Sequence, residues 1–133
     1  MADKIGVLGS STATAVATTV VYTVPSAKAA KVQIMWSAES HATNSTGDLT
    51  ITVNGVAVAT SLNLTAARFY HSSNTLMVSA VETAAPTGES AILTVAPAPF
   101  IYYLSAADTV TYTVGTDELV SMDFPVVGVE IDV

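Results

Sequence analysis

The stretch DLTITVNGVAVAT, residues 48–60, carries the strongest local fold signal in the chain. Its centre, Asn54-Gly55, favours the two-residue type I′ turn, whose backbone twist matches that of a β-hairpin. One side of this hairpin is then apolar, while Thr and Ala residues form the other side. The register that the turn predicts pairs Val53 with Val56, Ile51 with Val58, and Leu49 with Thr60.

The rest of the chain also shows a pattern of short strands joined by turns. Pro, Gly and Asn, which are common in turns, recur about every ten to fifteen residues, the spacing expected between strands. An apolar alternation over residues 16–24 stops at Pro25, and residues 25–28 are predicted to form a turn between neighbouring antiparallel strands. After it, residues 32, 34 and 36 share one face, so Trp36 is assigned to the core. Further predicted strands are Thr75–Glu82, Ser90–Ala96, Phe100–Leu104, Thr109–Gly115 and Val126–Asp132, with loops at residues 84–88 and 96–99.

These strands predict an all-β fold, a single antiparallel β-sandwich of about eight strands with a jelly-roll-like arrangement. A length of 133 residues suits one domain over residues 1–133, with residues 1–11 as a candidate N-terminal arm. Half of the residues are hydrophobic and only 11% are charged, and the outer faces are expected to carry Thr and Ala. Either other subunits cover these faces in a homo-oligomer, or small uncharged residues simply accompany a stable β surface.

The charge pattern excludes several classes of partner. The chain has a net charge of −7, and its four cations are Lys4, Lys28, Lys31 and Arg68. Binding of nucleic acid or of an anionic membrane surface needs clustered cations, so neither is expected. The absence of cysteine excludes disulfides and thiolate metal sites. Residues 5–27 are free of charge but interrupted by hydroxyl residues, and we expect a strand there, not a targeting or membrane segment.

No catalytic constellation emerges from the titratable residues. His41 and His71 lie in polar stretches that we interpret as surface loops or turns, and neither belongs to a nucleophile elbow or a metal-binding pair. The acidic pair at residues 117–118 follows Gly115 and is typical of a turn. Glu130 and Asp132 share one side of a terminal strand, where repulsion favours solvent exposure. We therefore expect no enzyme, no cofactor and no metal.

The aromatic residues are the better candidates for binding. Rings at consecutive positions of a strand point to opposite faces, so at least one ring of each group points outward. Outward Tyr and Arg side chains serve as anchors in protein interfaces or as platforms for sugars, unless a neighbouring loop covers them. The candidate interface residues are Arg68, Phe69, Tyr70, Phe100, Tyr102 and Tyr103.

Three segments resemble small virion proteins of tailed bacteriophages: VYTVPSAKAAKVQI (residues 21–34), DLTITVNG (48–55) and YLSAADTV (103–110). In those proteins a strand ending in Tyr-Thr-Val-Pro turns through a small residue and Lys into a second strand, and an Asn-Gly hairpin follows. The third segment is similar to their Leu-x-Ala-Gly-Asp-x-Val turn, with Ala107 where glycine is usual.

The resemblance implies a capsid decoration (cement) protein, a homotrimer that binds the outside of a phage head lattice and stabilises it. Its partner would be the major capsid protein or another virion protein. Its location would be the virion, after assembly in the host cytoplasm. The alternatives are a collar, tail or fibre component, or a carbohydrate-binding adhesin module.

Overall fold

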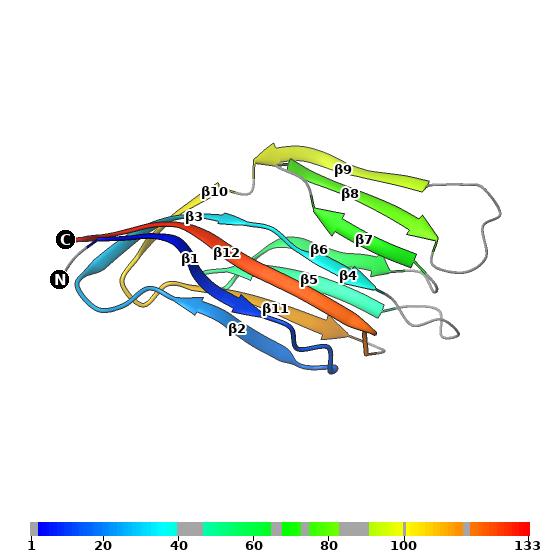
Figure 1. Cartoon of the computed structure of the whole chain (residues 1–133), viewed down its shortest axis with the longest axis horizontal. Coiled ribbons are helices and arrows are strands. Elements are labelled where there is room, and N and C mark those ends of the chain that lie inside the picture. Colours follow the sequence, from blue (N-terminus) through cyan, green and yellow to red (C-terminus); the bar gives the residue numbers. More distant parts are fainter. Residues whose placement is uncertain are drawn as a thin grey trace.

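A computed structural model describes residues 3–39, 47–64, 68–72, 75–82, 91–99, 101–115 and 118–133 (Figure 1). These residues form strands and connecting segments and contain no helix. The strands are β1 (Lys4–Ser11), β2 (Thr18–Thr23), β3 (Lys28–Ile34), β4 (Ser37–Glu39), β5 (Gly47–Val53), β6 (Val56–Leu64), β7 (Arg68–Ser72), β8 (Thr75–Glu82), β9 (Ala91–Pro99), β10 (Ile101–Ser105), β11 (Thr109–Gly115) and β12 (Ser121–Asp132).

Two antiparallel sheets face each other, which confirms the predicted all-β sandwich. The small sheet has the order β2-β11-β5-β6. The large sheet has the order β10-β3-β12-β4-β7-β8-β9, and β1 pairs with the other edge of β12. Twelve strands are described, not about eight: β1 occupies the candidate N-terminal arm, and β4 and β7 lie in segments for which no strand was predicted. The jelly-roll arrangement stays a prediction at this point.

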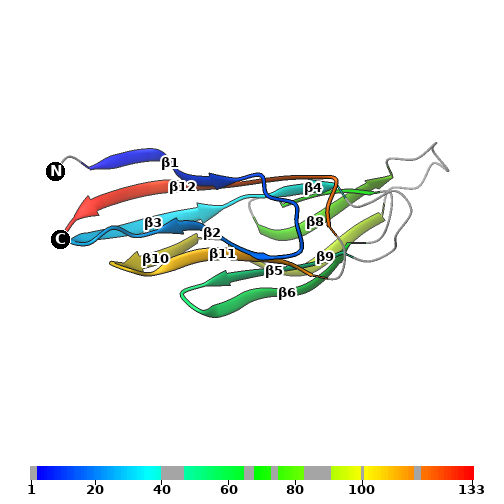
Figure 2. The same cartoon turned by 90° about the horizontal axis from the view of Figure 1, so that it is seen from below.

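The sandwich core lies between the small sheet and the β10-β3-β12-β1 part of the large sheet. Alternate residues of β3, β11 and β12 point into it, as period-two patterning requires. The rings of Tyr112 from the small sheet and Phe124 from the large sheet meet at a centroid distance of 4.9 Å. Trp36 is 3% exposed, which confirms its assignment to the core. β1 begins and β12 ends at one end of the molecule, and β8 and β9 lie toward the other (Figures 1 and 2).

The β5-β6 hairpin confirms the predicted turn and corrects the register behind it. Asn54 and Gly55 both have positive φ, 48° and 74°, as a type I′ turn requires, and Val53 pairs with Val56. Further back the predicted pairs are wrong, because two irregularities each shift the register by one residue. The observed partners are Ala59 for Ile51 and Leu62 for Leu49.

Residues 25–28 do form a turn, but it does not join neighbouring strands, so that prediction is wrong. β2 pairs with β11 in the small sheet, whereas β3 pairs with β10 and β12 in the large sheet. Ala27 adopts a φ of 61° where the chain crosses between the sheets. Val24 and Val32, each 1% exposed, therefore meet the same core from opposite sides.

Two proline-containing segments that lie outside the predicted strands belong to strands in the structure. β9 extends to Pro99, so the predicted loop at residues 96–99 is wrong; the strand lies at the end of the large sheet, where a missing N–H is tolerated. β12 begins at Ser121, before the predicted start. Pro125 lies where β12 changes partner from β4, which pairs up to Asp123, to β3, which pairs from Val126. A residue without an N–H fits this break in the ladder.

Residues 4–11, within the candidate arm, form β1. It pairs with β12 from Lys4 opposite Glu130 to Ser11 opposite Phe124. A Cβ atom on Gly9 would overlap the carbonyl oxygen of Val21 in β2. This close backbone approach between the two sheets closes one side of the sandwich, and only glycine permits it.

Candidate functional site

The outer face of β1, β12, β3 and β10 is the most distinctive surface of the described chain, and we call it the aliphatic face. Glu130 and Val32 point into the core, so their neighbours in sequence point outward. Directly paired residues share a face, which gives one transverse row of Ile5, Val129, Lys31 and Tyr103 and a second of Val7, Val127, Gln33 and Ile101. A third row holds Ile131, Ala29 and Ser105.

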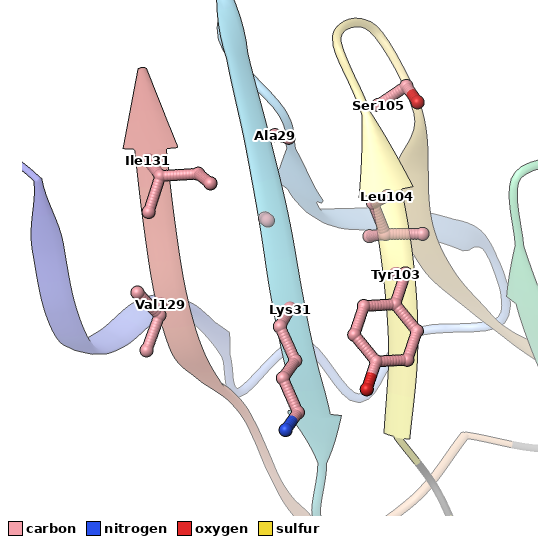
Figure 3. A pocket seen from close by; sticks show the side chains of 8 residues that line it. Ala29, Lys31, Tyr103, Leu104, Ser105, Val129 and Ile131 are labelled. Carbon is pink, nitrogen blue, oxygen red and sulfur yellow. The ribbon is translucent and has the colours of Figure 1, made fainter. Parts of the chain in front are cut away.

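The aliphatic face is hollowed along the strands. Figure 3 shows the side chains of Val129, Ile131, Lys31 and Tyr103 around the larger hollow, which has a volume of about 500 Å³. A second hollow of about 270 Å³ shares Lys31 and Val129 with the first, so the two are continuous. Their walls are mostly apolar, and they are open to solvent. The surface suits a broad apolar contact rather than an enclosed small molecule.

Large side chains stand exposed on this face although water solvates them poorly. Ile5 is 79% exposed, Val7 58% and Tyr103 78%. The Nζ atom of Lys31 lies 5.7 Å from the centroid of the Tyr103 ring, within range of a cation–π interaction. Among the described residues, the rows of the aliphatic face contain this one cation and no carboxylate.

The outer face of the small sheet has a different chemistry. Its inward residues are apolar, and the outward positions of β2, β5 and β11 carry Thr18, Thr23, Thr50, Thr52, Thr109, Thr111 and Thr113. The hydroxyl groups of Thr18 and Thr113 lie 2.8 Å apart in a hydrogen bond. The composition of the strands predicts Thr and Ala on the outer faces of the sandwich. That is right for the small sheet and wrong for the large one, so the two sides of the sandwich present different surfaces to a partner.

A buried polar cluster lies beneath the aliphatic face, near the termini. The hydroxyl group of Tyr22 donates a 2.7 Å hydrogen bond to Oε2 of Glu130, and both residues are buried. The Nζ atom of Lys28, whose side chain is 3% exposed, lies 2.6 Å from Oδ1 of Asp132. The prediction that Glu130 and Asp132 both favour solvent is therefore wrong for Glu130. β3 and β2, both remote in sequence, supply the partners for this cluster.

The electrostatics of the cluster follow from these contacts. Burial and then the bond to Glu130 raise the pKa of the Tyr22 hydroxyl. The hydrogen bond between Lys28 and Asp132 raises the pKa of the lysine and lowers that of the carboxyl group. Tyr22 is thus held in its protonated form, and Lys28 and Asp132 in their charged forms, and these contacts tie β12 to β2 and β3.

Replacing Tyr22 by phenylalanine is expected to lower the free energy of unfolding by about 1–3 kcal/mol, because a buried acceptor on Glu130 loses its donor. Urea unfolding at neutral pH measures this, and Tyr103→Phe, at a 78% exposed position, should change stability by less than about 0.5 kcal/mol.

The same variant has a pH signature. In the unfolded chain Tyr22 loses its proton near its ordinary pKa of 10.0, whereas the folded chain retains it above that value. Its contribution to stability is complete below pH 10 and declines as the pH rises further. Tyr22→Phe should therefore flatten the fall in stability above pH 10; an unchanged slope would contradict the raised pKa.

The structure separates the predicted interface residues. Arg68, Phe69 and Tyr70 lie on β7, which pairs with β4 and β8 away from the β10 edge. Phe100 lies outside the described residues. Tyr102 packs against the core, and burial raises its pKa. Tyr103 is on the aliphatic face, so it is the one candidate that the described side chains place on this surface.

The remaining chemical candidates form no site among the residues that the structure describes. His41 and Asp117 lie outside the described residues. His71, predicted in a turn, belongs to β7, where its backbone pairs with Ser37 and Ser79. Where the structure describes the chain, no group of three or more His, Asp or Glu residues is placed to hold a metal ion. Nor does that part of the chain contain a helix with the length and apolar character needed to span a membrane.

The apolar residues of the aliphatic face are the ones that sequence reasoning missed. The signal was present in Val126-Val127-Gly128-Val129, where apolar residues occupy both sides of one strand. Such a run indicates burial on both faces.

Comparison with protein families, with curated proteins and with solved structures finds no match for this chain.

Proposed function

We propose that the chain is a structural subunit of a bacteriophage virion, and that it acts as a capsid decoration protein on the outside of the head lattice. The observation that carries the proposal is a sandwich sheet that is apolar on both faces, with its outer face uncovered. Monomeric proteins rarely leave contiguous apolar patches of more than a few hundred Å² exposed to water, and larger ones mark interaction sites. The proposal assigns no reaction, metal or cofactor to the chain.

The strand pairing supports the jelly-roll arrangement that this class of protein would have. Four antiparallel pairs are nested one inside the next: β1 with β12, β2 with β11, β3 with β10, and β5 with β6. Wrapping such a long double ribbon places β12 beside β3 and β11 beside β5, as observed. In this interpretation β4, β7, β8 and β9 are additions to an eight-stranded jelly roll.

Binding to phage heads tests the function. Purified protein is incubated with empty heads assembled from the major capsid protein of the same genome, and the heads are sedimented. We expect saturable co-sedimentation and heads that resist heat better, because many weak contacts on one lattice add up. Absence of saturable binding at micromolar concentration would contradict decoration and favour a collar, tail or fibre position.

The exposure of Tyr103 favours one alternative, a carbohydrate-binding adhesin module. A ring that is 78% exposed beside an open hollow can stack on a sugar. This alternative predicts binding on a glycan array that is lost in Tyr103→Ala and retained in Val20→Glu. The decoration proposal predicts no such tyrosine-dependent signal.

A further inference from the structure

We propose that the aliphatic face is a self-association surface, on which a second copy of this chain docks by its own aliphatic face. This inference rests on the proposed structural role and identifies the partner of its main surface. The face consists of side chains from four adjacent strands, so it is broad and sheet-like. The surface that best matches a twisted sheet face is another sheet face, packed about 10 Å away.

The size of the face is sufficient for a weak homotypic contact. Four strands and about six residues along each give a footprint of roughly 20 Å by 20 Å, or about 400 Å². Protruding side chains such as Tyr103 raise the accessible area above this footprint. Two copies then bury about 800 Å² or more in total, which is below the roughly 1,200 Å² of stable specific interfaces and in the range of weak, transient ones. Association should therefore depend on protein concentration.

Charge also favours a second copy at this position. The chain carries a net charge of −7, so two copies repel each other over most orientations. The rows of the aliphatic face contain no carboxylate among the described residues, and their one cation, Lys31, lies against the ring of Tyr103. A contact made through these three rows therefore brings none of their carboxylates together, because the rows hold none. A basic partner, by contrast, would find no carboxylate there to pair with.

Sedimentation velocity over a wide range of protein concentrations tests the proposal. Wild type should shift from the 13.6 kDa of one chain to a multiple of it. Val7→Glu places an unpaired carboxylate in the contact and should raise the dissociation constant about tenfold or more. Val20→Glu is its matched control, since Val7 and Val20 are 58% and 59% exposed on opposite sides of the sandwich. This control should associate as wild type does.

A second variant keeps the test valid even if Val7→Glu does not fold. Tyr103→Ala truncates a largely exposed ring and should weaken association several-fold while circular dichroism stays unchanged. A dimer that both variants dissociate supports the proposal, whereas a trimer would require a head-to-tail contact and would contradict docking of one aliphatic face on another. A wild type that remains monomeric at the highest concentration, or an oligomer that neither variant weakens, would overturn it.

The two proposals fail separately. A monomer that still sediments with heads removes the self-association surface and leaves decoration intact. An oligomer that dissociates in Val7→Glu but never binds heads retains the surface and removes decoration.

Discussion

Replacing Phe124 by alanine is expected to lower the free energy of unfolding by about 3–5 kcal/mol, as Phe-to-Ala changes in cores do. Phe124 is 1% exposed and its ring meets that of Tyr112 across the sandwich. The substitution removes apolar area and leaves a cavity between two sheets that cannot collapse freely. Because whole domains are stable by only about 5–15 kcal/mol, this is a large share of the total.

Chemical denaturation followed by tryptophan fluorescence measures the effect, since the buried Trp36 reports on core packing. The control is Val120→Ala, a truncation at a position that is 53% exposed and is expected to cost less than about 0.5 kcal/mol. A loss for Phe124→Ala of under about 1 kcal/mol would mean that the two sheets do not share this core.

Replacing Gly128 by alanine should destabilise the protein by about 3 kcal/mol or more, the upper range for overpacking. A Cβ atom at this position would overlap the carbonyl oxygen of Lys31 and crowd the Cα atom of Val32. Both are backbone atoms of the neighbouring strand β3, so a side-chain rotation cannot relieve the overlap. The two strands would have to separate where their pairing holds the centre of the large sheet.

The unfolding temperatures of two separate variants, Gly128→Ala and Val129→Ala, test this expectation. The control truncates the adjacent, outward-facing residue and adds no atom, so its unfolding temperature should fall much less. Equal stability of Gly128→Ala and wild type would show that β12 and β3 are not in the close register described.

Prediction from sequence succeeded where the signal was local. The Asn54-Gly55 turn needs two residues with positive φ, and only a few residue types accept that conformation. The bounds of β8 and β11 also agree with those predicted, because alternation and turn residues mark both ends of these strands. The hairpin register was predicted only at its tip, since bulges depend on the packing of both strands.

Prediction of the candidate site was poorer, for the same physical reason. Tyr103 was among the candidates, but Val7, Val127 and Val129 were not, because an apolar run such as residues 126–129 does not reveal which of its two faces another element covers. The burial of Glu130 required knowledge that the Tyr22 hydroxyl group lies 2.7 Å away, across 108 positions of sequence. No local pattern carries that information.

By itself, the sequence determined that this chain is built of strands, where its tightest turn lies, and that it has few charges with which to face water. Those properties follow from backbone preferences and from side chains within a few residues of each other. The tertiary structure alone decided which strands share a sheet, why residues 25–28 cross between sheets, and that one outer face is aliphatic while the other is rich in threonine. Each of these depends on contacts between distant segments, whose free energy becomes available only when the whole sandwich forms.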